Sequence, residues 1–144
     1  MTILHVAFNV GTSEYVVAAH DVLHLESFVE ATRVPGAPEF VAGIVQVRGK
    51  LVPVIDLRTR FGVEPAANKL DNRVIVVKVE ARVAGLLVDS AREVVRLEES
   101  AFEPPPSLIG RQAAGFVKAV ATVGQRLLLV VDVSRLLGEE ATHA

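Results

Sequence analysis

An internal repeat constrains the fold of this chain more than any other feature of the sequence. Three segments of the N-terminal part recur in the same order in the C-terminal part: VLHLES (22–27) as VVRLEE (94–99), VAGIVQV (41–47) as AAGFVKAV (113–120), and VIDLRTRFG (54–62) as VVDVSRLLG (130–138). Such self-similarity indicates a duplicated structural unit. The two halves lie at about 1–66 and 72–140, joined by the polar stretch EPAANKLDN.

Each half contains five short runs with the alternation and Val-rich composition of β-strands. We expect strands at 3–10, 14–19, 22–28, 43–48 and 51–56, and at 74–80, 83–88, 92–97, 115–122 and 127–132. Because closing a sheet removes its exposed edges, five plus five strands predict an all-β fold of two small barrels. Neither barrel would bury enough apolar surface alone. We therefore expect a shared hydrophobic core and one domain spanning 1–144.

A short helix is expected after the last strand of each half. Asp56 precedes LRTRF and Asp132 precedes VSRLL, and the two segments are followed by Gly62 and Gly138. Asp is a favoured N-cap, and Gly commonly ends a helix. We interpret the two carboxylates as helix caps rather than catalytic groups.

Composition argues against several classes of function. The formal charge is −2, from 15 basic and 17 acidic residues, and Trp and Cys are absent. A nucleic-acid-binding barrel needs a basic groove and aromatic platforms, and a thiolate site needs cysteine. No apolar run approaches the roughly 20 residues of a membrane-spanning helix, and the N-terminus lacks the features of a secretion signal. We expect a cytoplasmic protein that neither inserts into membranes nor binds nucleic acid.

The sequence contains no recognisable catalytic or metal-binding motif. GIVQVRGK resembles a phosphate-binding loop, but five residues separate Gly43 from Gly49, Leu51 replaces the hydroxyl residue, and the intervening residues have the pattern of a strand. The histidines lack ligand spacing, and no serine lies in a nucleophile elbow. His20 and His24 are interpreted as a solvated strand face. We expect no enzymatic activity, no cofactor and no metal.

The tip of one hairpin carries an Arg-Gly pair whose role the residues leave open. VRGKL at 47–51 is typical of a hairpin tip, with Gly49 supplying a positive φ. Its counterpart VGQRL at 123–127 has no such pair, so the scaffold does not require Arg48. Pro53 indicates an edge strand or a bulge, because proline donates no ladder hydrogen bond. Arg48 is either part of a solvated turn or an anchor of a protein interface.

The run GIVQVRGKLVPVIDLRTRFG resembles the signature of the CheW family, G-[VI]-x-N-x-R-G-x-[VI]-[VI]-P-[VI]-[VI]-D-L-R. The likeness covers nearly the whole chain, through VLHLESF, APEFVAG, DNRVIVV, RVAGLLVD and EVVRL to the C-terminal helix. It implies two five-stranded SH3-like barrels around a shared core, without enzymatic activity. It further implies an adaptor, recruited to receptor arrays, that links the cytoplasmic tips of methyl-accepting chemoreceptors to the histidine kinase CheA, whose regulatory domain has the same fold.

The resemblance also implies partner-binding residues: Val22, His24, Gly43, Gln46, Arg48, Gly49 and Gly85. Two of them depart from the family pattern, because Gln46 stands where Asn is usual and His24 where Glu is common. The change to His24 removes a negative charge from an expected contact surface. Two functions therefore remain open: an adaptor that bridges receptor and kinase, or a paralogue that binds one partner and caps or modulates the array. The kinase interface is expected to be barrel on barrel, over Val45, Val47, Val52 and Val54.

Overall fold

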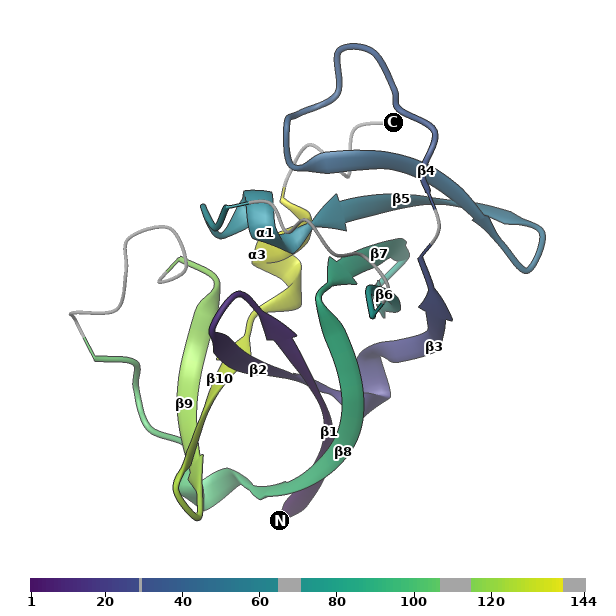
Figure 1. The fold of residues 1–144 in the computed structure, drawn as a ribbon. Helices are drawn as coiled ribbons and strands as arrows, with labels where there is room; N and C mark the ends of the chain where they lie inside the picture. Colours follow the sequence, from purple (N-terminus) through teal and green to yellow (C-terminus); the bar gives the residue numbers. More distant parts are fainter. Residues whose placement is uncertain (29, 65–70, 107–114, 139–144) are drawn as a thin grey trace.

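The structure is a computed structural model that describes residues 1–28, 30–64, 71–106 and 115–138. Two five-stranded sheets form two SH3-like barrels, with the short helices α1 and α3 between them (Figure 1). The strands are β1 (Thr2–Val10), β2 (Ser13–Ala18), β3 (Val22–Ser27), β4 (Val41–Val47), β5 (Lys50–Asp56), β6 (Arg73–Val79), β7 (Arg82–Val88), β8 (Ser90–Glu98), β9 (Val117–Val123) and β10 (Arg126–Val131). The helices are η1 (Ala19–Asp21), α1 (Leu57–Arg60), η2 (Glu99–Ala101) and α3 (Val133–Leu137).

The ten predicted strands are all present, but a barrel is not built from one half of the chain. Barrel 1 has the order β8-β1-β2-β10-β9, and barrel 2 has the order β3-β6-β7-β5-β4. Replacing each strand of barrel 1 by the strand five places away in the chain yields the order of barrel 2. Each barrel thus combines two strands of one half with three of the other. A two-stranded hairpin is marginally stable by itself, and this exchange completes both sheets.

The largest apolar cluster lies between the barrels and receives side chains from both sheets. Its centre is a row of aromatic rings: Phe8 and Tyr15 are 5.7 Å apart, and Tyr15 and Phe61 are 4.8 Å apart, measured between ring centroids. Smaller clusters fill the interior of each barrel. The predicted shared core is confirmed, and it is larger than either barrel interior.

Both predicted helix caps are present. The Asp56 side chain accepts a hydrogen bond from the Arg58 backbone N–H at 3.0 Å, and that of Asp132 accepts one from the Arg135 N–H at 3.3 Å. Gly62 follows α1 with a φ of 74°. None of the helices within the described ranges has the length and apolar character needed to cross a membrane.

Arg60 of α1 joins the two barrels. Its guanidinium lies 3.7 Å from the ring centroid of Phe40 and 4.7 Å from that of Phe116. Its Nε and Nη2 donate hydrogen bonds to the carbonyls of Leu136 and Arg135, at 3.2 and 3.1 Å. A planar cation satisfies the last carbonyls of α3 in this way while it packs between two rings.

We expect Arg60→Ala to lower the free energy of unfolding by about 2 kcal/mol, because two ring contacts and two hydrogen bonds are lost together. Arg60→Lys should recover only part of this loss, since lysine lacks the planar fork. Urea denaturation measures both effects. Arg92→Ala is the control, because Arg92 pairs with Asp71 at the surface and such pairs contribute about 0–1 kcal/mol. Equal losses for Arg60→Ala and Arg92→Ala would contradict this role.

Candidate functional site

The β4–β5 hairpin ends in a two-residue turn with an unusual backbone. Val47 pairs with Lys50, and the two turn residues, Arg48 and Gly49, have φ of 50° and 82°. Positive φ at both positions defines a type I′ turn, which suits the twist of a hairpin. Glycine adopts this conformation freely, whereas arginine does so at a cost. The counterpart turn has its positive-φ glycine, Gly124, at the first position, so the Arg-Gly arrangement is specific to the β4–β5 hairpin.

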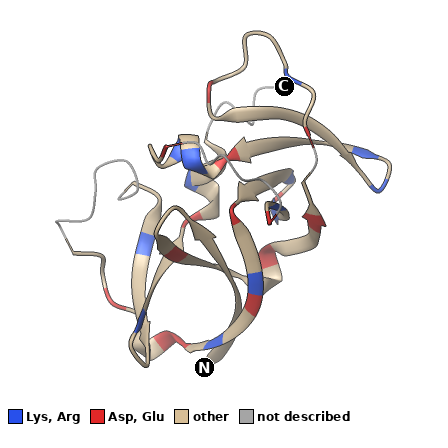
Figure 2. Ribbon diagram, in the orientation of Figure 1, with Lys and Arg blue, Asp and Glu red and all other residues tan. Residues whose placement is uncertain are grey.

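Arg48 forms an ion pair across the opening between β3 and β4. Its Nε lies 3.5 Å from Oε2 of Glu26, and the two side chains are 66% and 34% exposed. Glu26 and Gln46 line a crevice of about 300 Å³ at this opening, and Gln46 lies opposite Leu51, which is 74% exposed. Figure 2 shows positive charge at the tip of the hairpin. We call Glu26, Gln46, Arg48, Gly49 and Leu51 the hairpin face.

Two of the predicted partner-binding residues, Gly43 and Gly85, are buried in the wall of barrel 2. A Cβ on Gly43 would lie 2.3 Å from the Thr32 carbonyl oxygen, because Thr32 and Ile44 exchange two backbone hydrogen bonds that close the barrel. A Cβ on Gly85 would lie 2.5 Å from Cγ1 of Val74. These glycines permit close packing behind the hairpin, and their contact with a partner stays a prediction.

Val22 and His24 lie on different faces of β3, because a bulge separates them. Val22 packs against the core shared by the barrels, whereas His24 pairs in register with Val76 of the barrel 2 interior. The prediction that His20 and His24 share one solvated strand face is wrong, because His20 lies outside β3, although its side chain is 72% exposed. His20 lies in η1, and His24 is half-buried in β3.

An exposed apolar margin of the shared core was missed by the sequence analysis. Leu25 pairs in register with Ile75, and Val94 pairs with Val6, and both partners belong to the shared core. Scattered exposed leucines are ordinary, but a group around one core marks an interaction surface. Leu4 lies two residues before Val6 and so shares its side of β1. We call this group the apolar rim; its members are 47% to 59% exposed and are Leu4, Leu25 and Val94.

Of the valines predicted to supply a kinase interface, Val52 and Val54 are not available on the surface, whereas Val45 and Val47 are partly buried and line the crevice beside the hairpin. Val52 and Val54 are buried at 3% and 0% exposure, and Val45 and Val47 pack against them inside barrel 2. Pro53 also lies in an interior strand rather than an edge strand. It is tolerated there because the parallel pairing of β5 with β7 begins only at Val54.

His5 is a core residue of β1 without an evident chemical role. Its ring packs edge-on against Phe102 at 5.7 Å between centroids, and its Nδ1 lies 3.2 Å from the Ile3 carbonyl oxygen. Burial lowers the pKa of His5, and the contact with Ile3 opposes that effect only in part. Within the described ranges, no three His, Asp or Glu side chains are grouped to hold a metal ion. His143 lies outside the described residues.

The lowered pKa of His5 predicts a pH-dependent stability. Below about pH 6.5 the unfolded chain binds a proton that the folded chain resists, so stability present above that pH is lost as the pH falls. The loss is at most about 1.4 kcal/mol per pH unit. We expect the melting temperature to fall between about pH 8 and about pH 5.5, and to fall less in His5→Gln. The exposed His20→Gln is the control, and equal pH dependence in all three proteins would exclude His5 as the cause.

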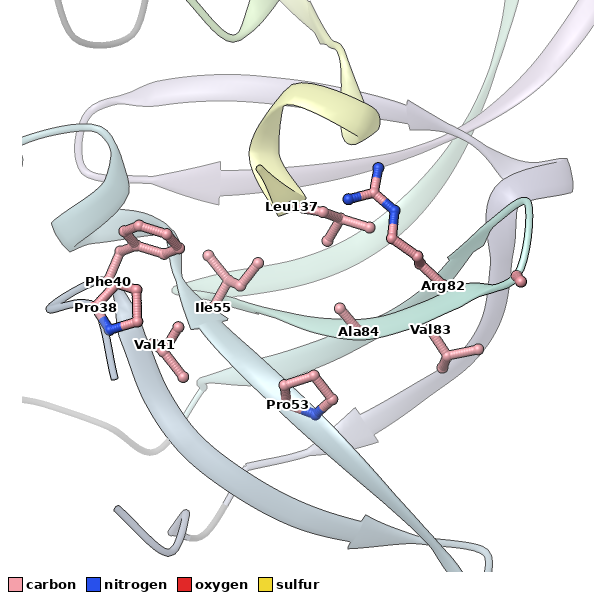
Figure 3. A pocket seen from close by; sticks show the side chains of 10 residues that line it. Pro38, Phe40, Val41, Pro53, Ile55, Arg82, Val83, Ala84 and Leu137 are labelled. Atoms are coloured by element: carbon pink, nitrogen blue, oxygen red, sulfur yellow. The ribbon is translucent and has the colours of Figure 1, made fainter. Parts of the chain in front are cut away.

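A groove of about 360 Å³ runs between β5, β7 and α3 (Figure 3). Its described lining is mostly apolar, with Phe40, Ile55 and Leu137 among its residues. Arg82, which also lines it, donates from Nη1 to the Gly138 carbonyl at 2.6 Å. The described lining therefore offers no acid and base aimed at one point, as catalysis would require.

The chain resembles proteins of one family over almost its whole length. A family model described as the CheW-like domain matches residues 5–141. The chain belongs to the CheW-like domain family. It is 30% identical to the chemotaxis protein CheW of Klebsiella aerogenes, over 92% of this chain and 80% of the relative, and 27% identical to the probable chemotaxis protein CheW of Rhizobium etli, over 96% and 90%. The crystal structure of the scaffolding protein TtCheW from Thermoanaerobacter tengcongensis superposes with a TM-score of 0.88 at 32% identity, covering 98% of this chain and 96% of that one.

In this CheW-like chain, the signature run forms β4, the Arg48-Gly49 turn, β5 and α1. The two residues that depart from the family pattern, His24 and Gln46, lie on strands β3 and β4, which border the same crevice. The apolar rim contains neither of them. Gln46 belongs to the hairpin face and lines the crevice, whereas His24 is not among the lining residues.

We expect Gly43→Ala to lower the free energy of unfolding by about 3 kcal/mol or more, because its Cβ would collide with backbone and its φ of 149° disfavours a side chain. Gly49→Ala is the matched control. Its φ is 82° with open space around a Cβ, so only about 1 kcal/mol of backbone strain is added. Chemical denaturation of both variants checks the contrast. A loss for Gly43→Ala no greater than that for Gly49→Ala would rule out the packing role.

Proposed function

We propose that this chain acts as one CheW-like unit, a non-enzymatic adaptor that couples methyl-accepting chemoreceptors to a CheA-type histidine kinase. It works in the cytoplasm, recruited to receptor arrays. Assembly is its mechanism: by binding both proteins, it makes kinase output depend on receptor conformation. Relatives named chemotaxis protein CheW and the fold of a scaffolding protein support this role.

The observation that carries the proposal is a pair of surfaces on opposite faces of one strand. On β3, Leu25 lies on the face of the shared core and belongs to the apolar rim, whereas Glu26 lies on the face of the barrel 2 interior and belongs to the hairpin face. Two surfaces that face apart let one small protein contact two partners at once. An adaptor requires two such surfaces, whereas a protein that binds one partner requires only one.

The two surfaces differ in chemistry, and we assign them accordingly. The apolar rim, made of aliphatic side chains at the margin of a core, fits the apolar face of a helical receptor tip. The hairpin face combines an exposed leucine with an Arg-Glu pair. This mixture of an apolar centre and charge is typical of interface anchors and fits the kinase regulatory domain.

The alternative is a paralogue that binds one partner and caps or modulates the array. His24 and Gln46 favour it, and both are on strands that border the hairpin-face crevice. Such a protein would keep the receptor contact at the apolar rim and lose the kinase contact.

Size-exclusion chromatography separates the two functions. The full chain is mixed with a receptor cytoplasmic tip and a CheA-type kinase regulatory domain, both from the organism that produces this chain. The adaptor predicts one complex of all three proteins. The alternative predicts a binary complex with the receptor tip only. Binding to neither protein would refute both functions.

Two substitutions test the assignment of the surfaces. Leu25→Glu should weaken binding of the receptor tip about tenfold or more and spare the kinase domain, and Arg48→Glu should do the reverse. Arg48→Glu should leave the melting temperature unchanged, because the side chain is largely exposed. Leu127→Glu, at an exposed leucine of the β9–β10 hairpin, is the control for added charge. Unchanged binding of both partners by Arg48→Glu would remove the hairpin face from the site.

A further inference from the structure

The guanidinium of Arg48 is only partly engaged, in contrast to those of two other arginines in this chain. Arg126 donates from Nε and Nη2 to Glu14, at 3.2 and 2.6 Å, and from Nη1 and Nη2 to Glu93, at 3.1 and 2.8 Å. Arg58 donates from Nε and Nη2 to Asp89, at 2.7 and 2.6 Å, and from Nη1 to the Glu64 carbonyl. Both edges of each fork are therefore occupied.

Arg48 uses one edge alone. Its single ion pair among the described residues joins Nε to Glu26, and no described residue accepts a hydrogen bond from its guanidinium. The planar fork of arginine presents Nε and one Nη along one edge, and Nη1 and Nη2 along the other. Glu26 therefore pairs with the edge that contains Nε, which we call the inner edge. The outer edge, formed by Nη1 and Nη2, is left toward solvent.

The backbone of the turn reinforces this arrangement. Arg48 has a φ of 50°, a conformation that arginine adopts at a cost. Its side chain pairs with Glu26 of β3, on the other side of the opening. A flexible arginine on a hairpin tip samples many rotamers, and an ion pair to a half-buried carboxylate restricts them. Restricting the rotamers before binding reduces the entropy lost on association.

We propose that Glu26 is a positioning residue for partner binding: it holds Arg48 by the inner edge, so that the outer edge accepts a carboxylate from the partner surface. The proposal rests on the adaptor function and deepens it, because it names an acidic side chain as the group recognised at the hairpin face. Arg126 demonstrates within the same fold that one guanidinium binds two carboxylates at once in this manner.

Positioning and simple electrostatics predict opposite results for the same substitution. If Glu26 only added negative charge near the contact, Glu26→Gln would tighten binding of an acidic partner surface, because a repulsion is removed. If Glu26 positions Arg48, Glu26→Gln weakens binding although the net charge becomes more favourable. Stability does not decide between them, since an exposed pair at 3.5 Å contributes little to it.

The test is a double-mutant cycle by isothermal titration of the full chain with the kinase regulatory domain, using Glu26→Gln, Arg48→Gln and the double variant. We expect Glu26→Gln to weaken binding about three- to tenfold, and to have less than about a twofold effect once Arg48 is Gln. Glu26→Asp should be intermediate, because its shorter arm keeps the charge. Glu98→Gln, at the repeat-equivalent position on β8, is the matched control and should bind as the unaltered chain does.

The outcomes separate this inference from the function on which it rests. Unchanged or tighter binding by Glu26→Gln, or an equal effect in the Arg48→Gln background, overturns the positioning role while the adaptor function stands. Failure of the unaltered chain to bind the kinase domain overturns both. A receptor tip titrated in parallel should respond to none of these variants, and a loss there would also contradict the proposal.

Discussion

The structure depends on the burial of one apolar layer between the two barrels. Each barrel interior is small, while the layer between them collects the stacked rings of Phe8, Tyr15 and Phe61 and the last residues of α3. Because the hydrophobic effect scales with apolar area removed from water, this layer is the main stabilising contribution. The exchange of strands between the halves follows from it, since both halves must contribute to both walls of the layer.

The same layer determines where the molecule can bind other proteins. A core between two curved sheets cannot be covered completely at its margin, so Leu4, Leu25 and Val94 remain partly exposed there. The hairpin face arises from a different constraint, the closure of barrel 2. Thr32, in the loop that follows β3, forms a bridge with Ile44 of β4, and Arg48 and Glu26 span the remaining opening between β4 and β3. Both candidate surfaces are thus consequences of packing a duplicated barrel.

Much of the fold could be predicted from the residues, whereas less of the site could. Strand periodicity, the two Asp caps and the repeat are local properties, so all ten strands and both helices were predicted correctly. Gly43 illustrates the limit for the site. The family signature places it among the partner-binding positions, but its nearest neighbour is the Thr32 carbonyl, which comes from a loop that no local pattern connects to it. Glu26 was missed for the same reason, because its partner Arg48 lies 22 positions along the chain.

The amino-acid sequence by itself determined the number and order of the strands, the turn at Arg48 and Gly49, and membership of the CheW-like family. These follow from alternation, turn chemistry and a contiguous motif, all of which act over a few residues. Only the tertiary structure decided which strands share a barrel, which side of β3 faces the shared core, and that Leu25 is exposed while Gly43 and Gly85 are buried. Those outcomes depend on contacts between residues far apart in the chain, where the burial of the whole layer outweighs any local preference.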